Sequence, residues 1–184
     1  ALTYLLNPSA TSNASGNFVN LFANSYTVSV TDASGCSATS NVILTQPSIL
    51  VWDSVNHRDI SCYGGSNGLV ASSASGGNGT ISYTLLPSGA TNYSGAFFGL
   101  AVGNYTLNAT DQNGCMVTAT FNINQAPPIT WNASSVIPAS CFGGNNGSLT
   151  ITASGGVGGF NYKLMPGAIV NTSGTFTGLS AGIY

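Results

Sequence analysis

Short segments of alternating or β-branched apolar residues run along the chain and are separated by turn sequences. The clearest of these segments predict β-strands at Ile81–Leu85, Tyr105–Ala109, Val117–Ile123 and Leu149–Ala153. Between them lie sequences rich in Gly, Asn, Asp and Pro that favour hairpins and tight turns, at residues 76–79, 87–89 and 111–114. No segment has the apolar period of a helix, so the pattern predicts an all-β chain.

The whole pattern repeats along the chain. Residues 1–105 align with residues 80–184 without a gap, and 40 of the 105 aligned positions are identical. Such self-similarity indicates a tandem array with a 79-residue period. Six or seven short strands in each period predict one small β-sandwich per repeat, of the immunoglobulin-like or fibronectin-like kind.

The repeat also divides the chain. We expect residues 47–125 to be a complete repeat that includes its N-terminal linker strand. Residues 1–46 would then be the C-terminal part of a preceding repeat, and residues 126–184 the N-terminal part of a third. Because the chain starts and stops within strand patterns, we interpret it as a window on a longer array.

Two recurring motifs predict local structure. The sequence from Leu100 to Tyr105 resembles the tyrosine corner of immunoglobulin-like sandwiches, in which the phenol binds nearby backbone. We expect corners at Tyr26, Tyr105 and Tyr184. In the motif Thr-Asp-x-x-Gly-Cys, we expect Asp32 and Asp111 to close turns by accepting backbone N–H groups.

Charge is scarce, since the 184 residues include two Lys or Arg and four Asp or Glu. Binding to nucleic acid or to an anionic membrane surface needs a basic patch, which two cations cannot form. The mean hydropathy is +0.25, and no apolar run approaches the roughly 20 residues of a membrane-spanning helix. We therefore expect no nucleic-acid partner and no membrane insertion in this segment.

Catalysis requires carboxylates or histidines that share a pocket. Asp32 and Asp111 occupy the same position in different repeats, and His57, the one histidine, has Val136 as its counterpart. We expect no catalytic residues, no metal site and no cofactor, and we predict that the protein is not an enzyme.

The four cysteines occupy two repeat positions, and without a Cys-x-x-Cys motif their spacing does not suit zinc. We expect disulfides and an oxidising compartment. One connectivity pairs Cys62 with Cys115 and leaves Cys36 and Cys141 to partners outside the window. The other pairs Cys36 with Cys62 and Cys115 with Cys141. We favour the first because each repeat should fold as its own unit.

Several of these motifs together resemble the SprB-type repeat. They are residues 61–68 (Ser-Cys-Tyr-Gly-Gly-Ser-Asn-Gly), 74–77 (Ala-Ser-Gly-Gly), 100–105 and 110–115 (Thr-Asp-Gln-Asn-Gly-Cys), with a second copy from Ser140 to Tyr184. That family occurs in very large cell-surface adhesins of gliding bacteria of the Bacteroidota. The resemblance implies an extracellular filament or stalk, exported by the type IX route, that acts in adhesion or gliding.

Sugars are a further expected covalent partner. Asn13, Asn92 and Asn171 share one repeat position and the sequence Asn-x-Ser-Gly, which fits either N-glycosylation or a turn built on Asn and Gly. The O-glycan acceptor pattern of the Bacteroidota, implied by the resemblance, occurs once, as Asp53-Ser54-Val55, and makes Ser54 a candidate.

Two classes of function follow. In the first, the chain is a structural and adhesive extracellular array at the cell surface, with further repeats or copies of itself as partners. In the second, each repeat binds carbohydrate or a protein, with Trp52 and Trp131 as candidate stacking platforms. We favour the first, because the residues that recur are mostly those that build turns and cores.

Overall fold

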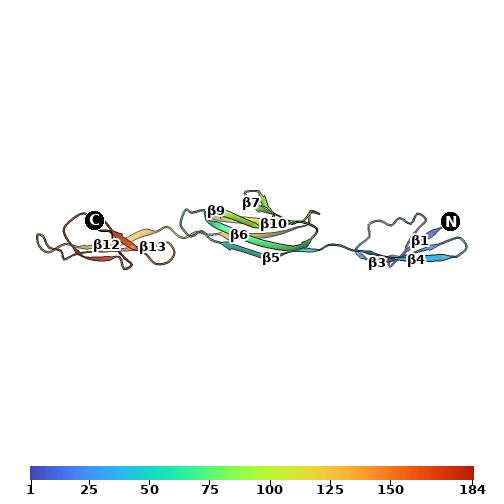
Figure 1. Ribbon diagram of the computed structural model, residues 1–184, viewed down its shortest axis with the longest axis horizontal. Coiled ribbons are helices and arrows are strands. Elements are labelled where there is room, and N and C mark those ends of the chain that lie inside the picture. The colour runs from blue at the N-terminus through green and yellow to red at the C-terminus, as the bar shows by residue number, and fades with distance from the viewer. The chain divides into compact units, whose positions relative to one another are not determined.

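The computed structural model describes residues 1–184 as an all-β chain of sixteen strands, without a helix (Figure 1). Its contacts divide it into two compact units, residues 1–49 with 76–78, and residues 50–75 with 79–184. All four strands expected from the sequence are present. They correspond to β7 (Ser82–Leu86), β10 (Gly103–Thr110), β11 (Met116–Ile123) and β13 (Gly147–Ser154).

The middle of the chain is a complete two-layer sandwich of seven strands. One sheet has the order β5-β6-β9, formed by β5 (Ser48–Arg58), β6 (Gly68–Gly77) and β9 (Ala96–Leu100). The other has the order β11-β10-β7-β8, where β8 is Ala90–Asn92. Figure 1 shows β5 and β6 in one layer and β7 and β10 in the other. This is the predicted immunoglobulin-like arrangement of short antiparallel strands.

The core of this sandwich lies between the two sheets. Alternate residues of the strands point inward, as the two-residue period of a strand requires. The buried side chains are Ile60, Val70, Tyr83, Leu85, Phe97, Leu100, Leu107, Ala109, Phe121 and Ile123. Gly68 lets the sheets approach closely, because a Cβ there would lie only 2.8 Å from the Ile123 side chain and from the Leu100 carbonyl oxygen.

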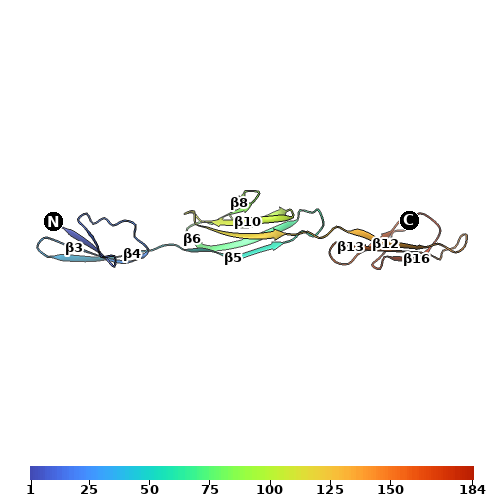
Figure 2. The ribbon, with the colours of Figure 1, turned by 180° about the vertical axis from the view of Figure 1, so that it is seen from behind.

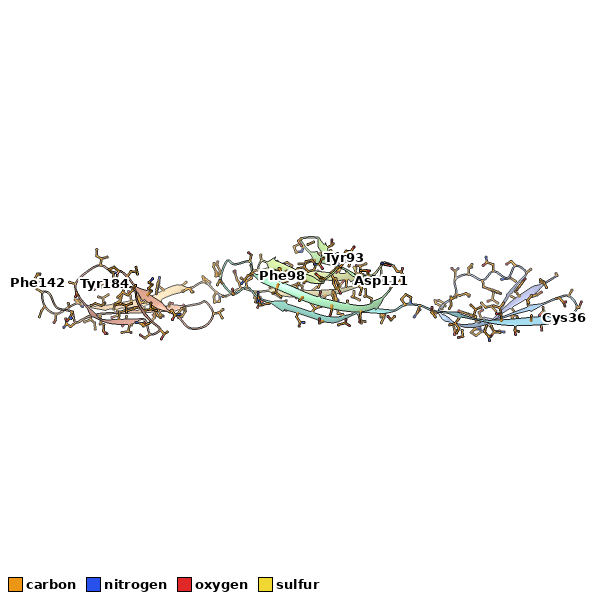
Figure 3. All side chains as sticks on the ribbon, viewed as in Figure 1. Cys36, Tyr93, Phe98, Asp111, Phe142 and Tyr184 are labelled. Atoms are coloured by element: carbon orange, nitrogen blue, oxygen red, sulfur yellow. The ribbon has the colours of Figure 1, made fainter.

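The two ends of the middle sandwich are built differently. At one end, here named the Cys62 end, the loop after β5 meets the segment after β11: the Gly64 N–H donates to Oε1 of Gln125 (2.9 Å), and Ile60 bridges to Gln125. At the other, the Cys115 end, the turn between β10 and β11 contacts the loop after β6, where Gly79 lies against the Gln112 side chain. Figure 3 shows Asp111 at this end.

The N-terminal unit contains one four-stranded sheet, with the order β2-β1-β3-β4. Its strands are β1 (Thr3–Asn7), β2 (Thr11–Asn13), β3 (Asn24–Thr31) and β4 (Ser37–Leu44). Shifted by one repeat period, their bounds coincide with those of β7, β8, β10 and β11. The pairing registers coincide too, since Tyr26 pairs with Val42 as Tyr105 pairs with Phe121. This unit is therefore the structural counterpart of one sheet of the middle sandwich.

The C-terminal part contains the counterpart of the other sheet. It has the order β12-β13-β16, formed by β12 (Thr130–Ile137), β13 and β16 (Thr175–Leu179), which Figure 2 shows side by side. A separate hairpin of β14 (Tyr162–Leu164) and β15 (Ile169–Asn171) accompanies it. Its small core consists of Leu164, Phe176 and Leu179, with Leu149 and Tyr162 packed against them.

Candidate functional site

All three tyrosines at the expected corners bind backbone. Each phenol donates to the carbonyl oxygen four residues earlier: Tyr26 to Phe22 (2.9 Å), Tyr105 to Ala101 (3.0 Å) and Tyr184 to Ser180 (3.1 Å). A hydrogen bond over this distance ties the start of the strand to the loop that leads into it. The three tyrosines thus act on the fold of the chain.

The two recurring aspartates lie in turns. Oδ1 of Asp111 accepts hydrogen bonds from the N–H groups of Asn113 (2.9 Å) and Cys115 (2.8 Å), and Asp111 is buried. Oδ1 of Asp32 accepts the equivalent bonds from Ser34 and Cys36, both at 2.9 Å. Each carboxylate therefore takes the place of backbone acceptors within its own turn. The structure contains no group of three or more His, Cys, Asp or Glu side chains close enough to hold a metal ion.

The favoured disulfide between Cys62 and Cys115 is wrong. All four cysteines are unpaired and exposed, so the alternative pairs Cys36–Cys62 and Cys115–Cys141 are not formed within the chain either. Cys62 and Cys115 lie at opposite ends of the middle sandwich, and the eight residues of β11 alone span about 26 Å. A disulfide needs Cα atoms less than about 7 Å apart, so these two thiols cannot meet in the folded repeat.

The three asparagines at the shared glycosylation motif build turns. Oδ1 of Asn92 accepts from the N–H groups of Ser94 (3.0 Å) and Gly95 (2.8 Å), and its Nδ2 donates to the Ala96 carbonyl oxygen (2.8 Å). Nδ2 of Asn13 and of Asn171 makes the same bond to the residue four positions later, at 2.9 and 2.8 Å. The nitrogen that would carry an N-glycan is thus already a donor in the turn, which favours the structural interpretation of the motif.

Ser54, the candidate for an O-glycan, lies in β5 and is half-buried. Its Oγ is 2.9 Å from Oγ of Ser73 on the neighbouring strand β6. The hydroxyl is therefore engaged in a cross-strand hydrogen bond, and glycosylation of Ser54 stays a prediction.

The charged residues near the end of β5 contact other strands and loops. Oδ1 and Oδ2 of Asp59 accept from the backbone N–H (2.9 Å) and the side-chain amide (3.3 Å) of Asn124. The pKa of the Asp59 carboxyl lies below its usual value, first because of the backbone bond and second because of the amide bond. Oδ1 of Asp53 accepts from Oγ of Ser75 (2.6 Å).

Trp52 and Trp131 differ in exposure although they are aligned copies. Trp52 packs against the core, with its ring centroid 6.0 Å from that of Tyr83. Trp131 makes the equivalent contact with Tyr162 at 6.4 Å but is 69% exposed. The complete repeat therefore uses this tryptophan for packing, which argues against a glycan-stacking platform.

Two apolar surfaces are open, one in each part that the sequence repeat identifies as a partial repeat. The first is the inner face of the N-terminal sheet, where Val42 is 46% and Leu44 is 39% exposed. Their counterparts in the middle sandwich, Phe121 and Ile123, are 7% and 1% exposed. The second is a groove of about 420 Å³ in the C-terminal part, lined by residues of β12, β13 and the segment after β16, Tyr184 among them. In the complete middle sandwich the equivalent surfaces are covered by a facing sheet.

Two of the solved structures to which this chain is similar are named as immunoglobulin domains. The chain is similar to the N-terminal eight Ig domains of Down Syndrome Cell Adhesion Molecule isoform 1.30.30 (15% identity, TM-score 0.45), over 71% of this chain and 19% of that one. It is also similar to Sidekick-1 immunoglobulin domains 1–4 (14% identity, TM-score 0.41), over 99% of this chain and 60% of that one. A third similar structure is that of Drosophila OTK extracellular domains 3–5 (14% identity, TM-score 0.36). The similarity covers 97% of this chain and 77% of that one.

The chain spans about a fifth of the first of these structures and well over half of the other two. No curated protein matches the chain. The family comparison matches the SprB repeat at residues 54–90 and again at residues 133–169, two segments that are one repeat period apart and belong to successive copies of the sequence repeat. These two segments of the chain are therefore similar to the SprB repeat.

Proposed function

We propose that the chain is a structural and adhesive segment of an extracellular cell-surface filament or stalk, with a role in attachment or gliding. This proposal rests on what the recurring residues do in the structure. Tyrosines, aspartates and asparagines that recur between copies all bind backbone of their own repeat. A binding module would instead present a recurring exposed set of charged or aromatic side chains.

The SprB repeat supports the coarser part of this function, an extracellular repeat module. Export, filament formation and gliding belong to the proposal. The chemistry of the surface is in keeping with it, because a fold with 3% charged residues is hydrated by hydroxyl and amide groups and offers no basic patch to nucleic acid. The structure also contains no helix that could cross a lipid bilayer.

Within this function, we propose that residues 47–125 are the folding unit of the array. They hold both sheets of the complete sandwich, its core and both types of end. In a longer array each such unit would be joined to the next through a short linker that contains proline, such as residues 124–129, which limits the conformations of the connection.

Immunogold electron microscopy on intact, unpermeabilised source cells tests the proposal. An antibody raised against the 184-residue chain should label filaments or stalks outside the cell, and a strain without the gene should lose both label and surface attachment. Label confined to the cell interior after sectioning, with none on intact cells, would overturn the proposal. A preimmune serum serves as the control.

A further inference from the structure

The first strand of the middle sandwich and the segment that follows its last strand are joined directly at the Cys62 end. The N–H of Ile60 donates to the carbonyl oxygen of Asn124 (2.9 Å), and Ile60 forms an isolated parallel bridge with Gln125. Asp59 accepts from the backbone N–H (2.9 Å) and the side-chain amide (3.3 Å) of Asn124, and Oε1 of Gln125 accepts from the Gly64 N–H (2.9 Å). Asp59, Ile60, Gly64, Asn124 and Gln125 are here named the exit clamp.

The surroundings hold the exit clamp in place. Ile60 is 3% exposed and Ala126, the residue after the clamp, is 6% exposed, so the backbone bond lies beside buried residues, where a hydrogen bond is stronger than in water. The loop that bears Gly64 is fixed by its own bonds. The Ser61 N–H donates to Oδ1 of Asn67 (3.1 Å), and Nδ2 of Asn67 donates to Oγ of Ser61 (2.7 Å).

The strand directions decide how tension would act on the clamp. β5 runs toward it from Ser48 and β11 runs toward it from Met116, so the two chain segments meet in parallel, as the bridge requires. In Figure 2 the arrow of β5 points to the end of the sandwich at which the chain leaves for β12. The preceding chain attaches at the start of β5, and the following chain attaches after Gln125. Tension would therefore pull the two partners in opposite directions along one axis.

This geometry resists tension in a way that a hairpin does not. When parallel partners are pulled in opposite directions, the bonds between them are stretched together. When a hairpin is pulled apart at its open end, the bonds of its ladder break one after another. The backbone and side-chain bonds of the exit clamp would thus have to fail at the same time.

The clamp also determines which part of the chain is extended. Asp59 and Asn124 are 65 positions apart in the sequence. Tension that enters along β5 passes through the clamp directly to the segment after β11. As long as the clamp holds, the chain from β6 to β11 is not extended.

We propose that the exit clamp is a mechanical device that lets the middle repeat transmit tension between its neighbours without opening. The proposal rests on the filament function, because a stalk that attaches a cell to a surface is pulled along its length. It adds resistance to force, a property that depends on the rate of unfolding and not on the free energy of unfolding alone.

The sequence repeat shows which part of the clamp is general. Gln125 has Gln46 as its counterpart in the preceding copy, and Gly64 has Gly143 in the following one. The aspartate is replaced by Pro138. The residues of the glutamine–glycine bond thus recur between copies, whereas the carboxylate bonds reinforce the middle copy.

Single-molecule force spectroscopy tests the proposal on the 184-residue chain, held at a fixed force through handles fused to its two ends. Opening of the middle sandwich frees the 65 positions between Asp59 and Asn124, about 210 Å of extended chain. The core variant Leu107→Ala assigns this event, because Leu107 is fully buried in the middle sandwich and its truncation should shift this event alone.

The double variant Asp59→Ala/Gln125→Ala removes the three side-chain bonds of the clamp. It should raise the rate of opening at a fixed force by more than about tenfold, because two of these bonds are made by a charged group. Gln125→Glu keeps an acceptor oxygen for the Gly64 N–H and should open within about twofold of the wild-type rate.

Asn92→Ala is the matched control. It also removes three hydrogen bonds, but Asn92 ends β8, within the part of the chain that the clamp keeps from being extended. These bonds are still intact when the clamp breaks, so the rate of opening should change by less than about threefold. Urea denaturation measures the free energy of unfolding of both variants, and circular dichroism verifies that both keep their strands.

If Asn92→Ala accelerates opening as much as the double variant does, at a similar loss of free energy of unfolding, the proposal is overturned. A folded double variant that opens at the wild-type rate overturns it as well. Should the double variant fail to fold, Gln125→Ala against Gln125→Glu provides the same comparison.

The two proposals fail separately. If the clamp variants open like wild type while immunogold labels surface filaments, the clamp is refuted and the filament function stands. If the variants open faster as expected but intact cells carry no label, the filament function is refuted and the clamp remains a property of the sandwich.

Discussion

Asp59 and Asn124, 65 positions apart in the sequence, are joined by two hydrogen bonds in which the Asp59 carboxylate accepts from both the backbone and the side chain of Asn124. They fasten the end of β5 to the segment that leaves β11, at the point where the chain passes into the linker. The third repeat has Pro138 in place of Asp59, so this fastening is particular to the middle sandwich.

The pair makes the stability of the middle sandwich dependent on pH. Because the pKa of Asp59 is lowered in the folded state, its contribution is present above its ordinary value of 3.8 and is lost as the pH falls through the lower, folded value. We expect wild type to melt at a higher temperature than Asp59→Asn at pH 7, and the difference to shrink below pH 4. A difference that is constant from pH 7 to pH 2 would contradict this account. Melting curves of both proteins across that range provide the measurement.

The tyrosine corner should contribute measurably to stability. Tyr105→Phe removes the bond to the Ala101 carbonyl oxygen and keeps the ring that stacks on Phe121, so we expect a loss of about 0.5–1.5 kcal/mol in the free energy of unfolding. Urea denaturation followed by Trp52 fluorescence in a Trp131→Phe background measures it. Tyr93→Phe is the control, because Tyr93 is 75% exposed, and equal losses in the two variants would refute the corner.

Variants of Asp111 distinguish a carboxylate that stabilises its turn from one that binds a metal ion. Asp111→Ala leaves two turn N–H groups without their acceptor and should cost about 1–3 kcal/mol, whereas Asp111→Asn keeps an acceptor oxygen and should lose less. The same fluorescence assay compares the two variants. A chelator should leave the wild-type melting temperature unchanged, and a drop on chelation that calcium reverses would show a metal site instead.

The asparagine turn predicts an unmodified side chain at Asn92. Its amide oxygen and nitrogen bind Ser94, Gly95 and Ala96, so Asn92→Ala should lower the stability of the middle sandwich by about 1–3 kcal/mol. Peptide mapping of the native protein should find Asn92 without a sugar. Quantitative glycosylation there, with an Asn92→Ala variant as stable as wild type, would reverse the assignment. The same map settles whether Ser54 carries an O-glycan.

The fold could be predicted from the sequence because its signals are local. The alternation of apolar and polar residues predicted the strands, and glycine and asparagine predicted the turns. The Cys62–Cys115 disulfide was predicted wrongly because the distance between the two cysteines depends on the topology of the whole sandwich, which is not a local property. Cys62 follows β5 and Cys115 follows β10, and the strands between them run back and forth across the sandwich so that the two residues finish at opposite ends. Spacing alone contains no information about that direction.

The burial of inward strand residues is not a local property either. Val42 and Phe121 occupy the same register, and each reads as an inward strand residue; only the presence or absence of a facing sheet makes one exposed and the other buried. Turn residues such as Asp111 could be assigned because the carboxylate and its N–H partners lie within one short turn of the chain.

In each tyrosine corner the acceptor is a main-chain carbonyl oxygen, whether the residue that bears it is Phe22, Ala101 or Ser180. A main-chain acceptor is present whatever the side chain, so mutation at that position leaves the bond intact. Copies of the repeat can thus differ at the acceptor position, and the bond requires only the tyrosine side chain. A protein built from duplicated copies of such a unit can therefore vary its surface residues at these positions while each copy keeps the same fold.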